Sequence, residues 1–339
     1  MDKNLKVVQF NRKRNSPGSI EILFATIRKF MSKTIEVELF VPKYESQGLF
    51  KRLAIVVESY FNQGDINHIT GDIHFASFLL QKKKTILTVH DCVSVIHSKG
   101  LKKAILKLFW FTLPLKRVQY VTVISQKTKE ELLTLVDFPE ERIFIIPDCI
   151  SDQFTYVEQK KFNKEKPRIL QIGTKTNKNL IRICEALKDI PCILDIVGKL
   201  SGEQLTALQK NNIDYETSVH ISEEELIQKY IDADIVAFVS TYEGFGMPVL
   251  EAQTVGRALI TSNISPMLEV AGGGACFVDP LNVNDIKLGF LKIIENIDFR
   301  KRIVQEGLKN SKSYNPQLIA NMYTDLYKKV YNESRDVIK

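Results

Sequence analysis

Short apolar runs alternate with longer amphipathic stretches along most of this 339-residue chain. The apolar runs are rich in Val, Ile and Phe, which is typical of strands buried in a parallel sheet. Amphipathic stretches such as Ile20–Ser32 and Ser125–Leu135 predict helices between them. The alternation indicates a doubly wound α/β sheet. In the front half we predict strands over Lys6–Phe10, Ile35–Val41, Ile66–Ile69, Thr85–Val89, Tyr120–Ile124 and Ile143–Ile146.

A polar segment, residues 151–167, interrupts the alternation, carries a Lys pair and ends on a proline. We interpret it as a linker between an N-terminal domain, 1–150, and a second domain, 168–315. In the second domain we predict strands over Arg168–Ile172, Cys192–Val197, Val219–Ile221, Ile235–Val239, Ala258–Thr261 and Gly274–Val278. The helices that we predict there are Asn179–Leu187, Glu223–Ile231 and Val249–Thr254.

The C-terminal segment, 316–339, predicts one more helix, about Pro316–Tyr331, that packs on one of the two domains, with the N-terminal domain as an option. Its apolar stripe is formed by Leu318, Ile319, Met322, Leu326 and Val330. The fold class that follows is α/β, with two Rossmann-like, doubly wound domains facing a cleft. Ligands of open α/β sheets bind at the carboxyl ends of the strands, so we expect the ligand in that cleft.

Composition narrows the class of protein. A hydrophobic fraction of 44% and a charged fraction of 26% are those of a soluble globular protein. No apolar run reaches the roughly 18 residues of a membrane span, and the N-terminus lacks the features of a secretory signal, so we expect a cytoplasmic protein. The five cysteines are scattered without a Cys-x-x-Cys pair, and no two histidines are spaced as a helical metal pair. We therefore expect neither disulfides nor a metal site.

The net charge of +7 is unevenly distributed. Residues 1–165 hold 26 Lys and Arg against 18 Asp and Glu, whereas the rest holds 21 against 22. This asymmetry indicates that the front half meets an anion. Within it, Lys99–Arg117 combines basic residues with Leu, Ile, Phe and the single tryptophan, Trp110. Such a helix is typical of contact with an anionic membrane surface, and the alternative is a core helix with a solvated basic edge. We reject nucleic acid because no nucleic-acid module is present.

The most informative motif is STYEGFGMPVLEA, residues 240–252. A buried strand is followed by a glycine-rich turn, and Pro248 stands where a helix begins. The N–H groups of such a turn and helix start can hold an anion. Glu243 at the strand end is expected to point into the cleft, and Glu251 lies about one turn inside the helix, within reach of sugar hydroxyls. The alternative is that Glu243 only stabilises the helix dipole and Glu251 is solvated.

A second motif begins the second domain, RILQIGTKTNKNL, residues 168–180. A strand ends near Ile172, a loop carries Lys175 and Lys178, and a helix begins near Asn179. A lysine beside a helix N-terminus at the carboxyl edge of a sheet suits a diphosphate. The alternative for both lysines is a solvated loop position.

The form EGFGxPxxEA resembles the signature of the family 4 retaining glycosyltransferases, also described as glycosyl transferases group 1, which have the GT-B fold. The loop after the first strand of the second domain resembles the G-T-x-x-x-K-N loop of that family, with Thr174 where many members have an arginine. The resemblance implies that Glu243 lies at the donor sugar, that Glu251 holds the ribose, and that Lys178 stabilises the departing diphosphate. Lys175 is the candidate for the second cation. Further implied donor contacts are Gly173, Thr174, His220, Ile221, Gly244, Phe245, Gly246, Met247 and Val249.

In the front domain the resemblance is moderate. Gly18 lies in the turn after the first strand, NSPGSIE, residues 15–21, whose amides could approach the donor phosphates or the acceptor. His90 in LTVHDC resembles the histidine of the family beside the transferred sugar. The alternative is that Asp91 caps a turn and His90 is a bystander. The pattern SQKT at Ser125–Thr128 predicts a helix cap rather than a catalytic serine.

The resemblance implies transfer of a hexose-type sugar, with retention, from a UDP- or GDP-type sugar to an acceptor hydroxyl, without a metal or another cofactor. The expected catalytic residues are Glu243, Lys178 and His90. The acceptor is expected to be a glycan or a lipid-linked glycan at the inner face of the membrane, in cell-surface polysaccharide synthesis. The aspartates of IDADIV, Asp232 and Asp234, enter a buried strand and do not form an Asp-x-Asp metal motif. The alternatives are a sugar-nucleotide epimerase or hydrolase on the same fold, or a non-catalytic subunit of a glycosyltransferase complex.

Overall fold

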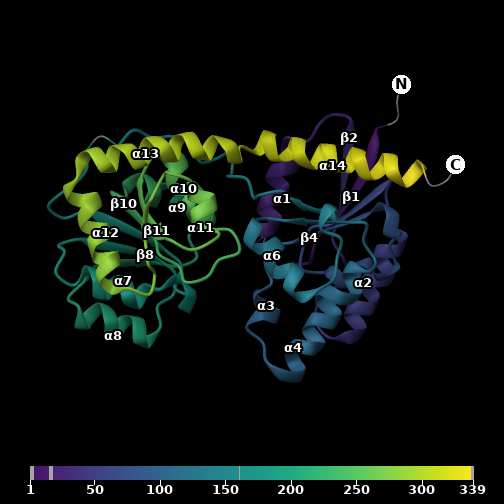
Figure 1. Cartoon of the computed structure of the whole chain (residues 1–339), viewed down its shortest axis with the longest axis horizontal. Helices are drawn as coiled ribbons and strands as arrows, with labels where there is room; N and C mark the ends of the chain where they lie inside the picture. Colours follow the sequence, from purple (N-terminus) through teal and green to yellow (C-terminus); the bar gives the residue numbers. More distant parts are fainter. Residues whose placement is uncertain (1–3, 15–17, 160, 337–339) are drawn as a thin grey trace. The chain divides into compact units, whose positions relative to one another are not determined.

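The computed structural model describes residues 4–14, 18–159 and 161–336. The chain divides into two compact units, one formed by Met1–Ser151 with Asn315–Lys339 and the other by Asp152–Tyr314. The C-terminal helix therefore belongs to the first unit, although it follows the second unit in the sequence (Figure 1). We describe each unit by itself.

The first unit is built on a parallel six-stranded sheet in the order β2-β1-β3-β4-β5-β6. Its strands are β1 (Leu5–Phe10), β2 (Ile35–Phe40), β3 (Ile66–Ile69), β4 (Thr85–Val89), β5 (Tyr120–Val123) and β6 (Ile143–Ile145). Its α-helices are α1 (Ser19–Lys29), α2 (Leu49–Phe61), α3 (Val93–Ile96), α4 (Gly100–Leu106), α5 (Leu113–Leu115), α6 (Gln126–Leu135) and α14 (Pro316–Asp336). Short 3-10 turns η1 (His74–Leu79), η2 (Lys82–Lys84) and η4 (Glu140–Arg142) and a π-helix η3 (Lys107–Thr112) complete it.

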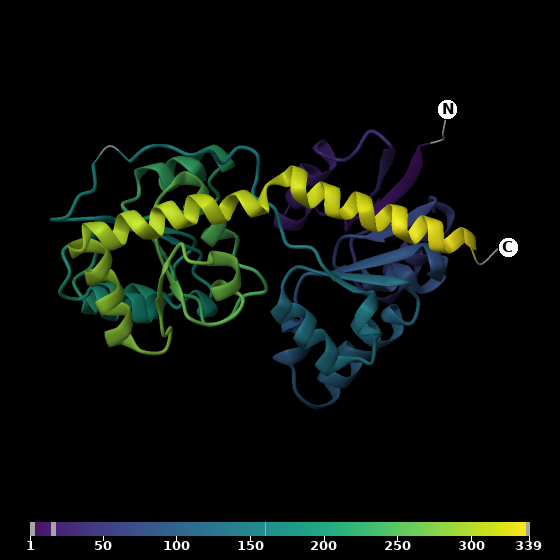
Figure 2. The ribbon, with the colours of Figure 1, turned by 45° about the horizontal axis from the view of Figure 1, so that its top comes forward.

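Apolar side chains cover both faces of this sheet. On one face, residues of α2, η3, α5 and α6 form a core with strand residues such as Val8, Leu87 and Val121. On the other face, α1 and α14 pack on strand residues such as Val7, Ile66 and Ile86, and the two helices lie side by side (Figure 2). The strands are buried from both sides, which explains their nearly continuous apolar sequences.

The buried stripe of α14 differs in phase from the predicted one. Ile319, Leu326 and Val330 are buried as predicted, but Leu318 and Met322 are exposed. Their place in the core is taken by Tyr323 and Tyr327. The Tyr327 hydroxyl lies 2.7 Å from Nδ1 of the buried His68, whose Nε2 lies 2.7 Å from Thr88 Oγ1. His68 is thus a core residue under α14, and burial lowers its pKa to about 3.

The second unit has a parallel six-stranded sheet in the order β12-β11-β10-β7-β8-β9. Its strands are β7 (Arg168–Ile172), β8 (Ile193–Val197), β9 (Asp214–Ser218), β10 (Ile235–Phe238), β11 (Ala258–Ser262) and β12 (Cys276–Val278). Its helices are α7 (Leu180–Leu187), α8 (Gly202–Lys210), α9 (Glu223–Asp232), α10 (Met247–Val255), α11 (Met267–Ala271), α12 (Val283–Glu295) and α13 (Ile297–Ser311), with short turns η5 (Thr176–Lys178) and η6 (Lys312–Tyr314). The large core on one face is formed with α7, α8 and α12. The predicted α/β class with two Rossmann-like sheets is confirmed.

Two segments of the second unit differ from expectation. The strand predicted at Val219–Ile221 is wrong: β9 ends at Ser218, and His220 has a φ of 59°, which no strand residue adopts. The segment predicted as a linker packs on this unit at its start. There the Phe154 and Tyr230 rings lie 5.6 Å apart, and Val157 N–H donates to the Val255 carbonyl at 3.3 Å.

Candidate functional site

The order of the second sheet fixes where a ligand would bind. The chain runs outward from β7 to β8 and β9 in one direction and from β10 to β11 and β12 in the other, so the order reverses between β7 and β10. In open parallel sheets, ligands bind beside such a reversal, at the carboxyl ends of the strands. The loop after β7 and the glycine-rich turn after β10, which are the two main motifs of the sequence, both lie at this position.

The loop after β7 is held in shape by side-chain amides. Asn179 has a φ of 62°, and its Nδ2 donates to the Val239 carbonyl at 3.1 Å and the Pro280 carbonyl at 2.7 Å. The Gln171 amide donates to the carbonyls of Gly173 and Lys178, at 3.3 and 3.1 Å. Gly173 has a φ of 87°, and a Cβ there would lie 3.1 Å from Lys178 Cε. Glycine thus allows the lysine side chain to cross close over the backbone.

Lys178 and Glu243 form an ion pair between the two loops. Lys178 Nζ lies 2.7 Å from Glu243 Oε1 and 4.5 Å from the centre of the Phe238 ring. Asn177 donates to the same carboxylate oxygen at 3.2 Å and to the Tyr242 carbonyl at 2.9 Å. The two charged side chains are only 17% and 15% exposed. The structure thus brings together two of the three predicted catalytic residues, and Asn177 joins them as a residue that the sequence analysis missed.

The glycine-rich turn leads into α10 as predicted. Gly246 has a φ of 111° and precedes the first helical residue, Met247, and Pro248 follows in the first turn. Phe245 is buried against the Tyr314 ring, 5.9 Å between centres, and Val249 is fully buried. The backbone from Gly244 to Met247 thus lies beside Glu243 at a helix N-terminus, where N–H groups and the helix dipole favour an anion.

Glu251 has a partner that the motif did not indicate. The Tyr230 hydroxyl of α9 donates a short hydrogen bond to Glu251 Oε2. Burial raises the pKa of Glu251 to about 7, while the Tyr230 bond and the charge of Lys178 act in the opposite direction. Glu251 is therefore neither a solvated helix residue nor permanently charged at neutral pH. Tyr230 lies in YIDADIV, where an aromatic residue before a strand gives no sign of such a role.

Other predicted contacts lie further from the ion pair. Thr174 is tied to the loop after β8, since its hydroxyl donates to the Lys199 carbonyl at 2.7 Å and its carbonyl accepts from Gln204 at 2.6 Å. Lys175 is exposed at the start of η5. His220 is exposed and Ile221 half-buried, just past β9, two strands away from β7 at the same edge of the sheet. Their roles as donor contacts stay predictions.

The two front-domain candidates lie in the first unit. Gly18 precedes α1, and its N–H donates to Glu21 Oε2 at 2.8 Å; residues 15–17 of the same predicted turn lie outside the described residues. His90 follows β4 and is nearly buried, with Nε2 2.9 Å from the Thr70 carbonyl. Asp91 caps the next turn through the Val93 N–H, at 3.0 Å. Burial raises the pKa of Asp148 to about 6, against the opposing charge of His90.

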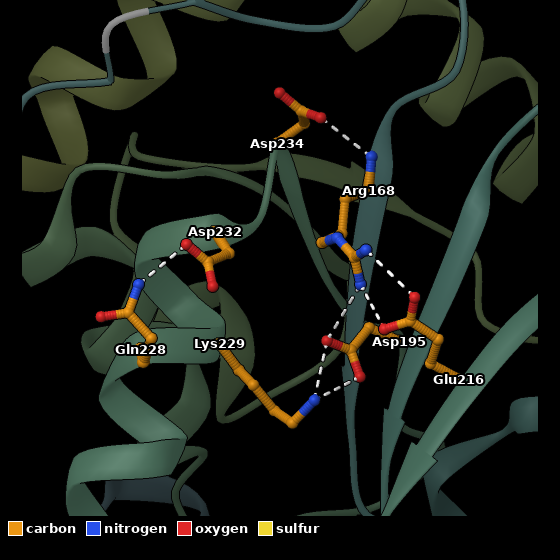
Figure 3. A network of polar contacts seen from close by, with 7 residues as sticks. All are labelled: Arg168, Asp195, Glu216, Gln228, Lys229, Asp232 and Asp234. Atoms are coloured by element: carbon orange, nitrogen blue, oxygen red, sulfur yellow. Dashed lines mark hydrogen bonds and ion pairs between the residues drawn. The ribbon is translucent and has the colours of Figure 1, made fainter.

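The aspartates of IDADIV take part in structural contacts (Figure 3). Asp234 accepts from the backbone N–H groups of Arg168 and Asn163, at 2.8 and 3.0 Å, and Asp232 accepts from Gln228 at 2.8 Å. Beside them, the buried Asp195 pairs with Lys229 at 2.7 Å. Within the described residues, no group of three or more His, Cys, Asp or Glu side chains is arranged to hold a metal ion.

Comparison with known proteins agrees with this geometry. The model of the family described as Glycosyl transferases group 1 matches residues 152–310, and that of Glycosyltransferase Family 4 matches residues 26–154. The chain belongs to the family 4 glycosyltransferases. The predicted resemblance is thereby confirmed across both units.

Solved structures with the GT-B fold are similar to this chain. The chain is similar to the Anabaena protein HepE, solved in complex with UDP and glucose, with a TM-score of 0.77 and 15% identity over 96% of this chain and 100% of that one. It is also similar to WaaG, a glycosyltransferase involved in lipopolysaccharide biosynthesis, with a TM-score of 0.70 and 14% identity over 94% of this chain and 99% of that one.

Several curated relatives of this chain are mannosyltransferases. The serotype-specific mannosyltransferase WbdA of Escherichia coli is 22% identical over 75% of this chain, which spans only 34% of the length of WbdA. The O-antigen chain mannosyltransferase RfbU of Salmonella typhimurium is 25% identical over 65% of this chain and 62% of its own length. No helix within the described ranges has the length and apolar character needed to cross a membrane.

Proposed function

We propose that this glycosyltransferase moves a hexose-type sugar, with retention of anomeric configuration, from a UDP- or GDP-sugar to an acceptor hydroxyl of a glycan or lipid-linked glycan. The observation that carries the proposal is the Lys178–Glu243 pair at the β7–β10 reversal, beside the N-terminus of α10. A cation, a helix N-terminus and two carboxylates at one sheet edge suit a diphosphate joined to a polyol.

Each group has a role in this proposal. As the bond between the anomeric carbon and the β-phosphate oxygen breaks, negative charge grows on the diphosphate. Lys178 and the N–H groups at the start of α10 stabilise that charge. Glu243 accepts hydrogen bonds from the transferred sugar, and Glu251 accepts them from the ribose hydroxyls. In this scheme the chain itself provides the stabilisation that a metal ion provides in other transferases.

The relatives support the choice of substrates. HepE has been solved with UDP and with UDP-glucose, which supports a nucleotide-sugar donor. The mannosyltransferases WbdA and RfbU support a hexose and a polysaccharide product, and the involvement of WaaG in lipopolysaccharide biosynthesis supports a lipid-linked acceptor. His90 and Gly18 stay candidates for contacts to the sugar or the acceptor. Since nucleotide sugars are made inside the cell, the proposed place of the reaction is the cytoplasmic face of a membrane.

The proposal is tested by incubating the chain with UDP- and GDP-hexoses, with and without an acceptor extract, and measuring the nucleoside diphosphate released. Lys178→Ala and Glu243→Gln are expected to reduce release strongly. Lys287→Ala, which removes a half-buried lysine of the same unit that pairs with Asp189, is the matched control and should leave release unchanged. Equal release by all three variants would sink the site assignment.

The same assay separates the alternatives. An epimerase or hydrolase would change the donor at the same rate without acceptor, whereas a transferase needs the acceptor for full rate. A non-catalytic subunit would bind the nucleotide sugar or leave it unbound, but in neither case convert it.

A further inference from the structure

Helix α2 is apolar on two faces. Ile55 and Val56 point into the core of the first unit, as expected for a helix covering a sheet. A second stripe, formed by Phe50, Leu53 and Val57 at i, i+3 and i+7, is exposed to solvent. Phe50 is 86% exposed, and the helix ends on Phe61, which is 76% exposed. Single exposed apolar residues are ordinary, but a contiguous helical stripe indicates a contact surface.

Most of the basic segment 99–117 lies in the continuous helical stretch of α4, η3 and α5, from Gly100 to Leu115. Leu106, Trp110 and Phe111 pack inward on the same core cluster as α2. Leu101, Ile105 and Phe109, at i, i+4 and i+8, face solvent, and Leu101 is 77% exposed. The sequence left two interpretations of this segment, a membrane-contacting helix and a core helix with a basic edge. Only the inner side of the stretch is packed as a core helix. The outer side carries an apolar stripe.

The two exposed stripes belong to neighbouring elements. The Arg52 guanidinium of α2 stacks on the Trp110 ring of η3, 4.7 Å from its centre, and lies 5.9 Å from the centre of the Phe75 ring. Both elements pack on one face of the sheet. This contact joins the inner sides of the two elements. We call the two exposed stripes, Phe50, Leu53 and Val57 with Leu101, Ile105 and Phe109, together the α2–α4 face.

The charge around this face is mostly positive, although α2 also carries the half-buried Glu58. Between Asp72 and Glu130 the sequence has eleven Lys and Arg but only one acid, Asp91. Exposed lysines lie beside the apolar stripes, namely Lys51, Lys102 and Lys103. Lys107, at the start of η3, is half-buried. An apolar stripe flanked by lysines matches the interface of an anionic bilayer, where apolar side chains enter the acyl boundary and lysines meet the headgroups. A second copy of this chain is disfavoured as occupant because a symmetric contact would oppose these lysines.

We propose that the α2–α4 face docks on an anionic lipid bilayer, with α2 and segment 99–117 acting together. This surface is where the chain would meet a lipid-linked acceptor. The existence of such an acceptor rests on the proposed function, whereas the docking on lipid does not. The α2 stripe was not recognised in the sequence, because its residues alternate with those that fill the core.

The test is co-sedimentation of the full chain with phosphatidylcholine vesicles, with and without phosphatidylglycerol. The triple variant Lys102→Glu, Lys103→Glu, Lys107→Glu should bind the anionic vesicles at least about a hundredfold more weakly, since each lysine near such a surface contributes a factor of about five. The matched charge control is Lys82→Glu, Lys83→Glu, Lys84→Glu, on η2 beside α14, which should bind nearly as the parent does.

A second pair of variants tests the apolar stripe. Phe50→Ser with Leu53→Ser should weaken binding about tenfold or more and remove the part that survives high salt. Leu318→Ser with Met322→Ser, which changes two exposed apolar residues of α14, is the control. Equal binding by the α2–α4 variants and their controls would overturn the proposal. A parent dimer that these variants dissociate, with vesicle binding unchanged, would also overturn it, in favour of a second copy.

Binding of UDP and GDP is measured on every variant. The proposed nucleotide site lies in the second unit, so affinity should be unchanged throughout. Urea unfolding of each variant, compared with that of the parent, checks that the substituted first unit is folded. Loss of vesicle binding with nucleotide binding intact supports the membrane surface even if the proposed transfer reaction fails.

Discussion

Replacing Glu243 with Gln is expected to strengthen the binding of a nucleoside diphosphate while turnover is lost. The substitution keeps the size of the side chain and removes the charge that holds Lys178 Nζ at 2.7 Å. In the free protein Lys178 is occupied by this partner. A diphosphate must compete with Glu243 for the lysine, and in the variant that competition is absent.

The magnitude follows from the geometry of the pair. Two unit charges 2.7 Å apart attract each other by about 6 kcal/mol at an effective dielectric constant of about 20. Most of this is cancelled by the loss of hydration, and a partly buried pair contributes about 1–2 kcal/mol net. The dissociation constant of UDP or GDP should therefore fall about 5- to 30-fold in the variant. Turnover should fall about a hundredfold or more, because in the proposed role Glu243 is a charged hydrogen-bond acceptor for the sugar near the reacting carbon.

Isothermal titration calorimetry with UDP and GDP, at fixed pH and salt, measures this effect. Glu295→Gln is the matched control, because Glu295 is an exposed carboxylate at the end of α12 in the same unit. Its affinity should equal that of the parent. Unchanged or weaker nucleotide binding in Glu243→Gln would refute the idea that Glu243 competes for Lys178.

Three further predictions concern single residues. Lys178→Ala should lower kcat about 100- to 1000-fold by removing charge stabilisation from the leaving diphosphate, measured as initial rates at saturating donor; a change in KM alone would contradict this role. Because burial raises the pKa of Glu251 to about 7, its carboxyl ionises as pH rises through neutrality, so affinity for a nucleotide sugar should rise about tenfold between about pH 6 and about pH 8. Glu251→Gln should flatten this profile, and a profile equal to the parent's would exclude Glu251 as its cause. Tyr327→Phe removes the hydroxyl beside His68 Nδ1 and should destabilise the first unit by about 1–2 kcal/mol in urea unfolding, whereas Met322→Ala should change stability by less than about 0.5 kcal/mol; equal effects would contradict the observed phase of α14.

Strands buried on both faces were predictable from the sequence. Ile66–Ile69, Thr85–Val89 and Arg168–Ile172 have the predicted bounds, since a continuous apolar run leaves little choice of structure. Strand β9 was missed because it is an edge strand, and its residues, DYETS, carry no apolar alternation. It is held by pairing to β8 alone, which no local pattern records.

The candidate site was also predictable from the sequence only in part. Motifs with unusual backbone demands, such as Gly246 before Pro248, identify the turn and the helix start without a structure. Contacts across long sequence separations do not leave such a signature. The Tyr230–Glu251 bond and the Asn177–Glu243 bond join residues 21 and 66 positions apart, and only the folded sheet brings them together. The phase of α14 was misjudged because tyrosines with buried hydroxyls were not counted among the apolar positions.

We infer that the carboxyl ends of β7 and β10 in the second unit form a donor site in which Lys178 and Glu243 act on a nucleotide sugar. The most direct measurement is acceptor-dependent release of nucleoside diphosphate from a panel of UDP- and GDP-hexoses, compared between the parent chain, Lys178→Ala and Glu243→Gln. The claim predicts release from at least one donor by the parent chain and a loss of about a hundredfold or more in both variants. Release that continues undiminished in both variants would contradict it.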